Sequence, residues 1–167
     1  ETFMQAIDLA DDLWVTPRAE SALTLECSDP SLPTDGRNLV LRAAAALRER
    51  TGHPGGAHFR LLKHIPSEAG LGGGSSDAAG ALLGLAAAWG LTLPPAELAA
   101  LAAAVGSDVA FFLTGGTAWC TGRGEQVEPL AAGGELQFVL VCPKVRVSTA
   151  EAYRRLRVPL TGTQASA

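Results

Sequence analysis

The sequence has few basic residues and no cluster of them. Its 13 Lys and Arg residues are outnumbered by 17 Asp and Glu residues, so the formal net charge is -4. Domains that bind nucleic acid carry a basic stripe or patch, and we therefore expect no nucleic-acid partner. The sequence also lacks a run of about 18 apolar residues, so no membrane span is predicted. No signal peptide is visible at its start.

Cysteine is scarce as well. Cys27, Cys120 and Cys142 lie far apart, and no CxxC pattern occurs. The three histidines, which fall between residues 53 and 64, show no ligand spacing. Zinc sites need closely spaced ligand pairs, so no metal-binding residues are predicted. An odd number of unpatterned thiols indicates buried free cysteines in a reducing compartment, and we expect a cytoplasmic protein.

One stretch, by contrast, is dense in glycine. Residues 70–74 hold four glycines interrupted only by Leu71, and two serines follow. A strand-like segment, residues 58–65, precedes them, and a segment with helical spacing, residues 78–89, comes after. Glycine lets the backbone take positive φ and approach a ligand closely. A helix start adds unpaired N–H donors, so this stretch predicts a phosphate site.

A glycine run is also typical of a flexible linker. Here both flanks are apolar and periodic, which favours a loop between core elements. The spacing does not fit GxGxxG, and no lysine follows the glycines. The Rossmann and P-loop patterns are therefore disfavoured.

The length predicts one domain. We expect strands over residues 6–9, 13–16, 22–27, 58–65 and 137–142, the last of them buried. We expect helices over residues 38–50, 78–89 and 94–105, and a fourth that starts near residue 149 and includes Tyr153. A turn over residues 122–124 separates the segments 116–121 and 125–130.

The glycine-rich stretch resembles the second motif of the GHMP kinases, P-x-x-x-G-L-G-S-S-A-A. In this chain it runs Pro66-Ser-Glu-Ala-Gly-Leu-Gly-Gly-Gly-Ser-Ser-Asp-Ala-Ala79. This version is similar to the branch that phosphorylates a cytidyl-diphospho-methylerythritol on the non-mevalonate route to isoprenoids. The resemblance implies an α/β (α+β) fold, the N-terminal domain of the family, in which a mixed sheet packs against helices.

Further segments match the same family in the same order. They cover residues 36–43, 63–66, 106–112, 122–125 and 143–149. Ser107 and Ala110 depart from the family's Gly-Ala-Asp-Val-Pro-Phe-Phe, while Asp108 is kept. The family's first motif, Pro-Ala-Lys with the lysine of the catalytic pair, has no counterpart. The Asp-Gly-Tyr-His segment that helps to bind the cytidyl group and the third motif, in a C-terminal domain, are also without one.

We therefore expect a domain over residues 1–160 that is truncated at both ends, with a frayed tail over residues 161–167 and no C-terminal domain. Such a chain should not transfer phosphate by itself. The resemblance implies ATP and Mg²⁺ as cofactors and a small-molecule alcohol as the phosphate acceptor, with no membrane partner.

The resemblance also implies roles for single residues. Asp108 would face the acceptor hydroxyl as base or orienting group, and Tyr153 would stack on cytosine. The residues implied in binding ATP are Pro66, Ser67, Glu68, Ala69, Gly70, Leu71, Gly72, Gly73, Gly74, Ser75 and Ser76, together with Asn38 and Lys63 near the adenine.

Each of these residue types also has an ordinary structural role. Asp108 could be a turn aspartate after a helix-ending glycine, and Tyr153 could be a core aromatic. For Asp77 we prefer a structural role, since a carboxylate favours a helix start. For the whole chain, the alternatives are another small-molecule kinase of the family, a non-catalytic nucleotide- or anion-binding module, and a structural domain with a glycine-rich bend.

Overall fold

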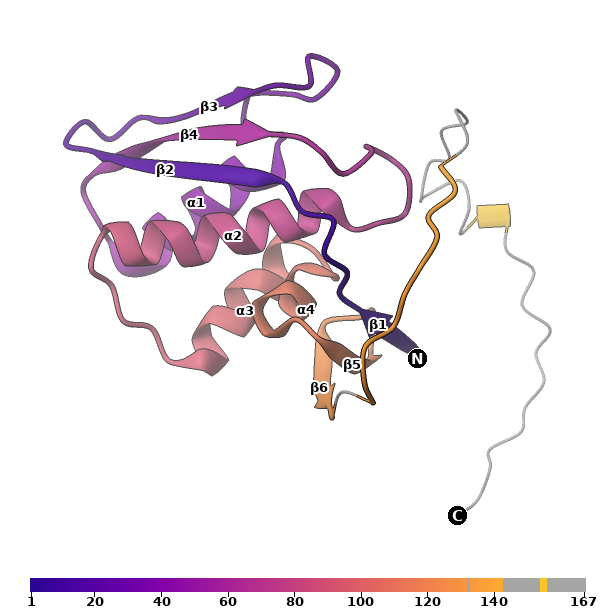
Figure 1. Ribbon diagram of the computed structural model, residues 1–167. Helices are drawn as coiled ribbons and strands as arrows, with labels where there is room; N and C mark the ends of the chain where they lie inside the picture. Colours follow the sequence, from indigo (N-terminus) through magenta and orange to yellow (C-terminus); the bar gives the residue numbers. More distant parts are fainter. Residues whose placement is uncertain (132, 143–153, 156–167) are drawn as a thin grey trace.

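The computed structural model describes residues 1–131, 133–142 and 154–155. Its helices and strands follow the order β1 (Thr2–Gln5), β2 (Asp12–Arg18), β3 (Leu23–Cys27), α1 (Leu39–Thr51), β4 (Gly56–Leu62), α2 (Gly73–Ala88), α3 (Pro95–Val105), α4 (Val109–Thr114), β5 (Thr117–Thr121) and β6 (Gln126–Leu130), as Figure 1 shows.

A mixed sheet of order β2-β4-β3 is built around β4. Strand β4 pairs antiparallel with β2 and parallel with β3, and Phe59 lies opposite Val15 on one side and Leu25 on the other. Two parallel neighbours need a crossover between them, and α1 supplies it. The expected mixed sheet packed against helices is confirmed.

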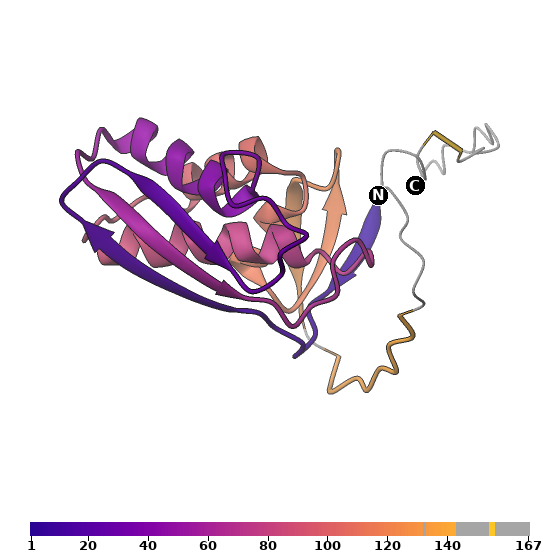
Figure 2. The same cartoon turned by 90° about the horizontal axis from the view of Figure 1, so that it is seen from above.

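Helices α1 and α2 cover one face of this sheet, and α3 and α4 lie beyond them (Figures 1 and 2). The largest fully buried side chains come from these layers, among them Leu47, Phe59, Leu82 and Phe111. Helix α2 approaches β2 closely because it carries glycine on that side. A Cβ at Gly84 would lie only 3.0 Å from Val15 Cγ2. Close helix–sheet packing therefore explains a glycine in the middle of a helix.

The remaining strands form a second, antiparallel sheet of order β1-β5-β6. The expected strand over residues 6–9 is wrong. The strand lies earlier, at Thr2–Gln5, where it pairs with Thr117–Cys120 of β5. Both segments are short and apolar in part, so local pattern could not separate them. The strand forms at Thr2–Gln5 because β5 pairs with these residues. Residues 6–11 instead connect the two sheets.

The expected buried strand over residues 137–142 is also wrong. This segment is not a strand, and its valines, Val139 and Val141, are 92% and 84% exposed. Its composition favours a strand, but a strand also needs a partner edge and a covered face. The expectation of buried cysteines holds only for Cys120, since Cys27 is half-buried and Cys142 is exposed.

The predicted tail over residues 161–167 lies outside the described residues. The predicted helix near residue 149 also falls there, except for the helical residues 154–155. Among the helices that the structure describes, none is long and apolar enough to cross a membrane.

Candidate active site

The glycine-rich stretch forms a tight loop followed directly by a helix. Three residues before the helix have left-handed backbone: Glu68 (φ 57°), Gly70 (φ 76°) and Gly72 (φ 69°). Helix α2 begins at Gly73 rather than near residue 78, so the last glycines form its first turn. Glycine disfavours helix, and local pattern therefore missed this turn. Backbone N–H groups of a first turn have no partner within the helix, which suits an anion.

Two cavities meet at this loop. The larger, of about 530 Å³, is lined by the start of α1, the loop from residue 66 to 75, Lys63 and Asp77. The smaller, of about 370 Å³, is lined mainly by apolar side chains of β1, the connection that follows it, α4 and the segment after β6. Residues 70–72 and Asp108 line both cavities. The backbone of the loop therefore lies between a cavity that is lined by the charged side chains of Lys63 and Asp77 and a more apolar one.

Asp108 lies at the junction of the two cavities. It is the residue before α4, is half-buried, and its carboxylate makes no capping hydrogen bond to that helix. A Cβ placed on Gly124 would lie 3.4 Å from Asp108 Oδ1, so the glycine turn between β5 and β6 leaves room for the carboxylate. Burial and the charge of Asp108 raise the pKa of the neighbouring Cys120 thiol. Since it makes no capping hydrogen bond, the carboxylate of Asp108 does not stabilise the start of α4 in this way.

Beside the loop, the Lys63 side chain lies between two aspartates. Lys63 Nζ donates to Asp77 Oδ2 at 2.7 Å and also to Asp11 Oδ2. The three side chains are 7%, 6% and 2% exposed for Lys63, Asp77 and Asp11. The preferred interpretation of Asp77 as a helix-start carboxylate is wrong. Asp77 lies beyond the first turn of α2 and makes no cap; its partner is Lys63.

The charges in this cluster do not balance, since two carboxylates face one ammonium. Burial raises the pKa of Asp77 to about 6, and the hydrogen bond from Lys63 only partly opposes this. Burial also acts against the charge on Asp11, but hydrogen bonds from Lys63, Ile65 and His64 outweigh it and hold the pKa of Asp11 below its usual value. For Lys63, hydrogen bonds to both aspartates outweigh burial and raise the pKa.

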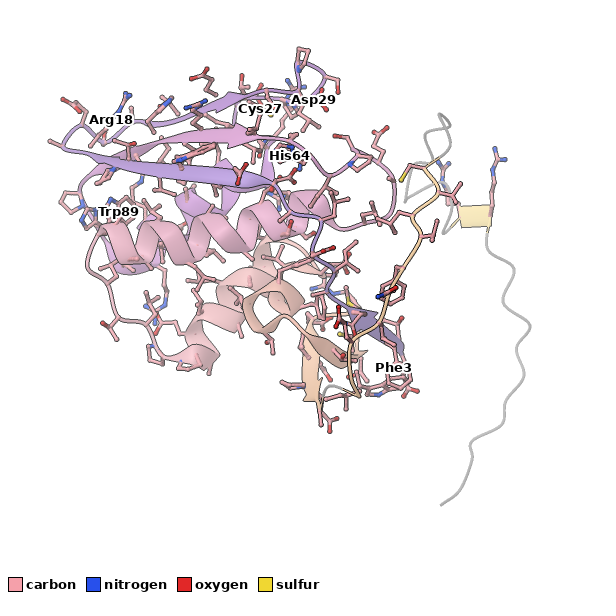
Figure 3. All side chains as sticks on the ribbon, viewed as in Figure 1. Phe3, Arg18, Cys27, Asp29, His64 and Trp89 are labelled. Carbon is pink, nitrogen blue, oxygen red and sulfur yellow. The ribbon has the colours of Figure 1, made fainter. Side chains whose placement is uncertain are left out.

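Asn38 forms part of the wall of the larger cavity and also caps α1. Its Oδ1 accepts from Val40 N at 2.9 Å, and its Nδ2 donates to Pro33 O at 2.8 Å. On the same side, Ser67 Oγ donates to Asp29 Oδ2 at 3.0 Å and ties the loop to the turn after β3. Figure 3 shows Asp29 and His64 at one end of the mixed sheet, with Trp89 and Arg18 at the other. The cavity lies at the Asp29 end.

The structure brings most of the predicted site residues together. Those that line the larger cavity are Asn38, Lys63, Pro66, Ser67, Glu68, Ala69, Gly70, Leu71, Gly72, Gly73, Gly74, Ser75 and Asp108. Ser76 lines the smaller cavity instead. Tyr153 lies outside the described residues. The residue that sequence reasoning missed is Asp11, which lies beside Asp12 between the expected strands over residues 6–9 and 13–16, and no local signal distinguishes the two.

The comparisons with known proteins agree with this arrangement. Residues 38–116 match the family model described as the GHMP kinases N terminal domain. A 4-diphosphocytidyl-2-C-methyl-D-erythritol kinase of Synechococcus sp. (strain CC9902) is 49% identical over 157 residues, which are 92% of this chain and 51% of that relative. This chain belongs to the GHMP kinases. Another relative, a 4-diphosphocytidyl-2-C-methyl-D-erythritol kinase of Pelotomaculum thermopropionicum, is 47% identical over all 167 residues, which cover 58% of its own length.

A solved structure gives the same result. The crystal structure of a 4-(cytidine 5'-diphospho)-2C-methyl-D-erythritol kinase superimposes with a TM-score of 0.68 and is 42% identical in sequence. The match covers 89% of this GHMP kinase chain and 52% of the solved chain. The chain therefore spans about half the length of the relatives it matches.

Proposed function

We propose that this chain is the nucleotide-binding part of a kinase that transfers phosphate from ATP to the 2-hydroxyl of 4-diphosphocytidyl-2-C-methyl-D-erythritol, in non-mevalonate isoprenoid synthesis. The observation that carries the proposal is the meeting of two cavities at residues 70–72 and Asp108. A kinase has to hold a nucleotide and an alcohol on either side of one point of transfer. The names of relatives that are 42–49% identical support this acceptor.

ATP occupies the larger cavity in this proposal. Its phosphates lie against the loop and the first turn of α2, where unpaired N–H groups and the helix dipole favour negative charge. The base lies toward the start of α1 and Asn38, whose Nδ2 keeps one hydrogen for a ligand because Pro33 O accepts only the other. Lys63 lies on the floor of this cavity, held by Asp11 and Asp77.

The alcohol lies in the smaller cavity, with its hydroxyl toward Asp108. A carboxylate there accepts the hydroxyl proton or orients the hydroxyl for transfer. Asp108 is suited to this because its carboxylate makes no capping hydrogen bond of its own. The apolar walls, which include Phe111 and Phe112, keep water from the point of transfer.

The residues of the larger cavity also suit Mg²⁺. Among the residues that the structure describes, no group of three or more His, Cys, Asp or Glu side chains could hold a metal by itself. Mg²⁺ is commonly held by phosphate oxygens, waters and one or two carboxylates, and Asp108 and the Ser75 hydroxyl line this cavity. The ion would neutralise charge on the phosphates.

The test is an ADP-release assay on the complete protein that carries this chain, with Mg·ATP and the cytidyl alcohol. We expect release that depends on the alcohol and that is much weaker for the same alcohol without its cytidyl group. ATP binding without any alcohol-dependent release would instead support a non-catalytic nucleotide-binding module. Release with another alcohol only would indicate a different small-molecule kinase of the family.

A further inference from the structure

Asp11 is the most buried member of the charged cluster, and it comes from the connection between the two sheets. Its Oδ1 accepts from the backbone N–H groups of His64 and Ile65, the latter at 2.8 Å. Its Oδ2 accepts from Lys63 Nζ. One side chain therefore holds three consecutive residues at the entrance of the glycine-rich loop.

The contacts continue from Lys63 into the helix that ends the loop. Lys63 Nζ donates to Asp77 in α2, and a Cβ placed on Gly73 would lie 3.3 Å from the same Nζ. The ammonium thus lies close to the first turn of α2. Asp11, Lys63 and Asp77 therefore connect the start of the loop to its end through side chains.

We propose that Asp11 is a positioning residue, which fixes the entrance of the loop relative to the start of α2 so that the N–H groups of both converge on the phosphates of ATP. The proposal deepens the proposed function and rests on it, since the loop must take a nucleotide for this geometry to matter. Asp11 lines neither cavity. It therefore acts through the backbone of residues 64 and 65 and through Lys63.

A carboxylate is needed at this position because both of its oxygens accept. An amide has a single acceptor oxygen, so an asparagine must leave either the two backbone N–H groups without a partner or the Lys63 ammonium with Asp77 alone. Unpaired buried polar groups are costly, and the entrance of the loop should shift or loosen. The neighbouring Asp12 is the natural control: its side chain is 58% exposed, and its Oδ2 lies 3.0 Å from Nε2 of the His64 ring.

The test compares Asp11→Asn with Asp12→Asn in the complete protein. For Asp11→Asn we expect a KM for ATP that rises about tenfold or more, as for one lost charge-assisted hydrogen bond, and a KM for the alcohol within about twofold of the unmodified protein. Asp12→Asn should leave both values unchanged. An unchanged KM for ATP in folded Asp11→Asn, or an equal rise in both KM values, would overturn the proposal.

Hydrogen exchange without nucleotide gives a second readout. In Asp11→Asn the amides of residues 64–72 should exchange faster while those of α1 keep their protection; equal exchange in both proteins overturns the proposal even if the proposed function fails. If Asp11→Asn does not fold, Asp11→Asn with Lys63→Met replaces it. There the amide oxygen accepts from the backbone N–H groups and no ammonium needs a partner, while burial keeps Asp77 protonated once Lys63 is gone. The protein should therefore fold and still bind ATP about tenfold more weakly. Normal ATP binding in that double variant counts against the proposal.

Discussion

The ring of Phe112 fills the space into which a side chain at Gly72 would project. A Cβ at Gly72 would lie 2.8 Å from Cζ and 2.9 Å from Cε2 of this ring, and Gly72 has a φ of 69°. Two costs therefore add in Gly72→Ala: about 1–2 kcal/mol for left-handed backbone and about 1–3 kcal/mol for overpacking.

We expect a clear fall in melting temperature for Gly72→Ala. Gly116→Ala is a matched control, since Gly116 has a φ of 66° and nothing lies within 4 Å of its Cβ position. It should show the backbone cost alone. Equal melting temperatures for the two variants would mean that the ring of Phe112 moves aside without a loss of folding free energy.

Gly74 allows a test of phosphate approach that leaves the fold intact. A Cβ there would meet only Leu39 Cδ1, at an ordinary 3.5 Å, and the backbone is helical. Alanine is favoured over glycine in helices by about 1 kcal/mol, so Gly74→Ala should melt at the same or a higher temperature. If phosphates lie against this turn, the added methyl group should raise the KM for ATP about tenfold or more, equivalent to about 1.4 kcal/mol.

The control for Gly74→Ala is Gly80→Ala in the same helix, where the added Cβ would lie 3.6 Å from Leu13 Cδ2 and away from both cavities. Its KM for ATP should not change. A normal KM for ATP in Gly74→Ala would show that the phosphates do not approach the start of α2.

Asp77 should make stability depend on pH in the weakly acidic range. Burial raises its pKa from 3.8 to about 6 in the folded protein. A carboxyl group with a higher pKa when folded favours the folded state most when it is protonated, and this contribution is lost as pH rises from about 4 to about 6. Two pKa units correspond to about 3 kcal/mol at most. Asp77→Asn cannot ionise and escapes this loss.

We therefore expect the melting temperature of Asp77→Asn, relative to the unmodified protein, to increase between pH 4 and pH 7. The contacts with Lys63, Ile65 and His64 that hold the pKa of Asp11 low do not involve Asp77, so we expect the contribution of Asp11 largely to cancel in the comparison. Asp8→Asn, at an exposed position, is the control and should show no such trend. A constant difference between Asp77→Asn and the unmodified protein across this range would contradict the prediction.

Asp108→Asn tests the assigned role of Asp108. An amide cannot accept the hydroxyl proton, and general base catalysis contributes about 10²–10⁴-fold in rate. We expect kcat to fall by about that factor, while the Kd for ATP measured by calorimetry and the melting temperature stay near their original values. Near-normal turnover in the folded variant would return Asp108 to the role of a turn residue.

Tyr153 is the one tyrosine of the sequence, and its predicted contact with cytosine can be tested by substitution. Stacking of a base on an aromatic side chain contributes about 1–3 kcal/mol. Tyr153→Ala should raise the KM for the cytidyl alcohol about tenfold and leave the KM for ATP nearly unchanged. A comparable rise in both values would indicate a core aromatic, and Tyr153→Phe, which keeps the ring, should behave like the unmodified protein.

The order of strand, glycine-rich loop and helix was predictable because each signal is local. Asn38 caps α1 with an oxygen that accepts from Val40 N, two residues along. Pro95 opens α3 and Gly106 follows its last residue. Such signals depend on backbone preferences of neighbouring residues, so the sequence by itself determined these elements and the position of the loop between them.

The tertiary structure decided which distant residues meet. Asp11 and Lys63 are 52 positions apart, and no periodicity links them or separates Asp11 from Asp12. Packing against Ile65 and Lys63 lets α2 begin among glycines that disfavour helix by themselves. The apolar run over residues 137–142 stays out of both sheets because propensity alone supplies no partner edge. Burial and pairing depend on the whole chain, and they placed Asp11 in contact with Lys63, His64 and Ile65 at the entrance of the loop.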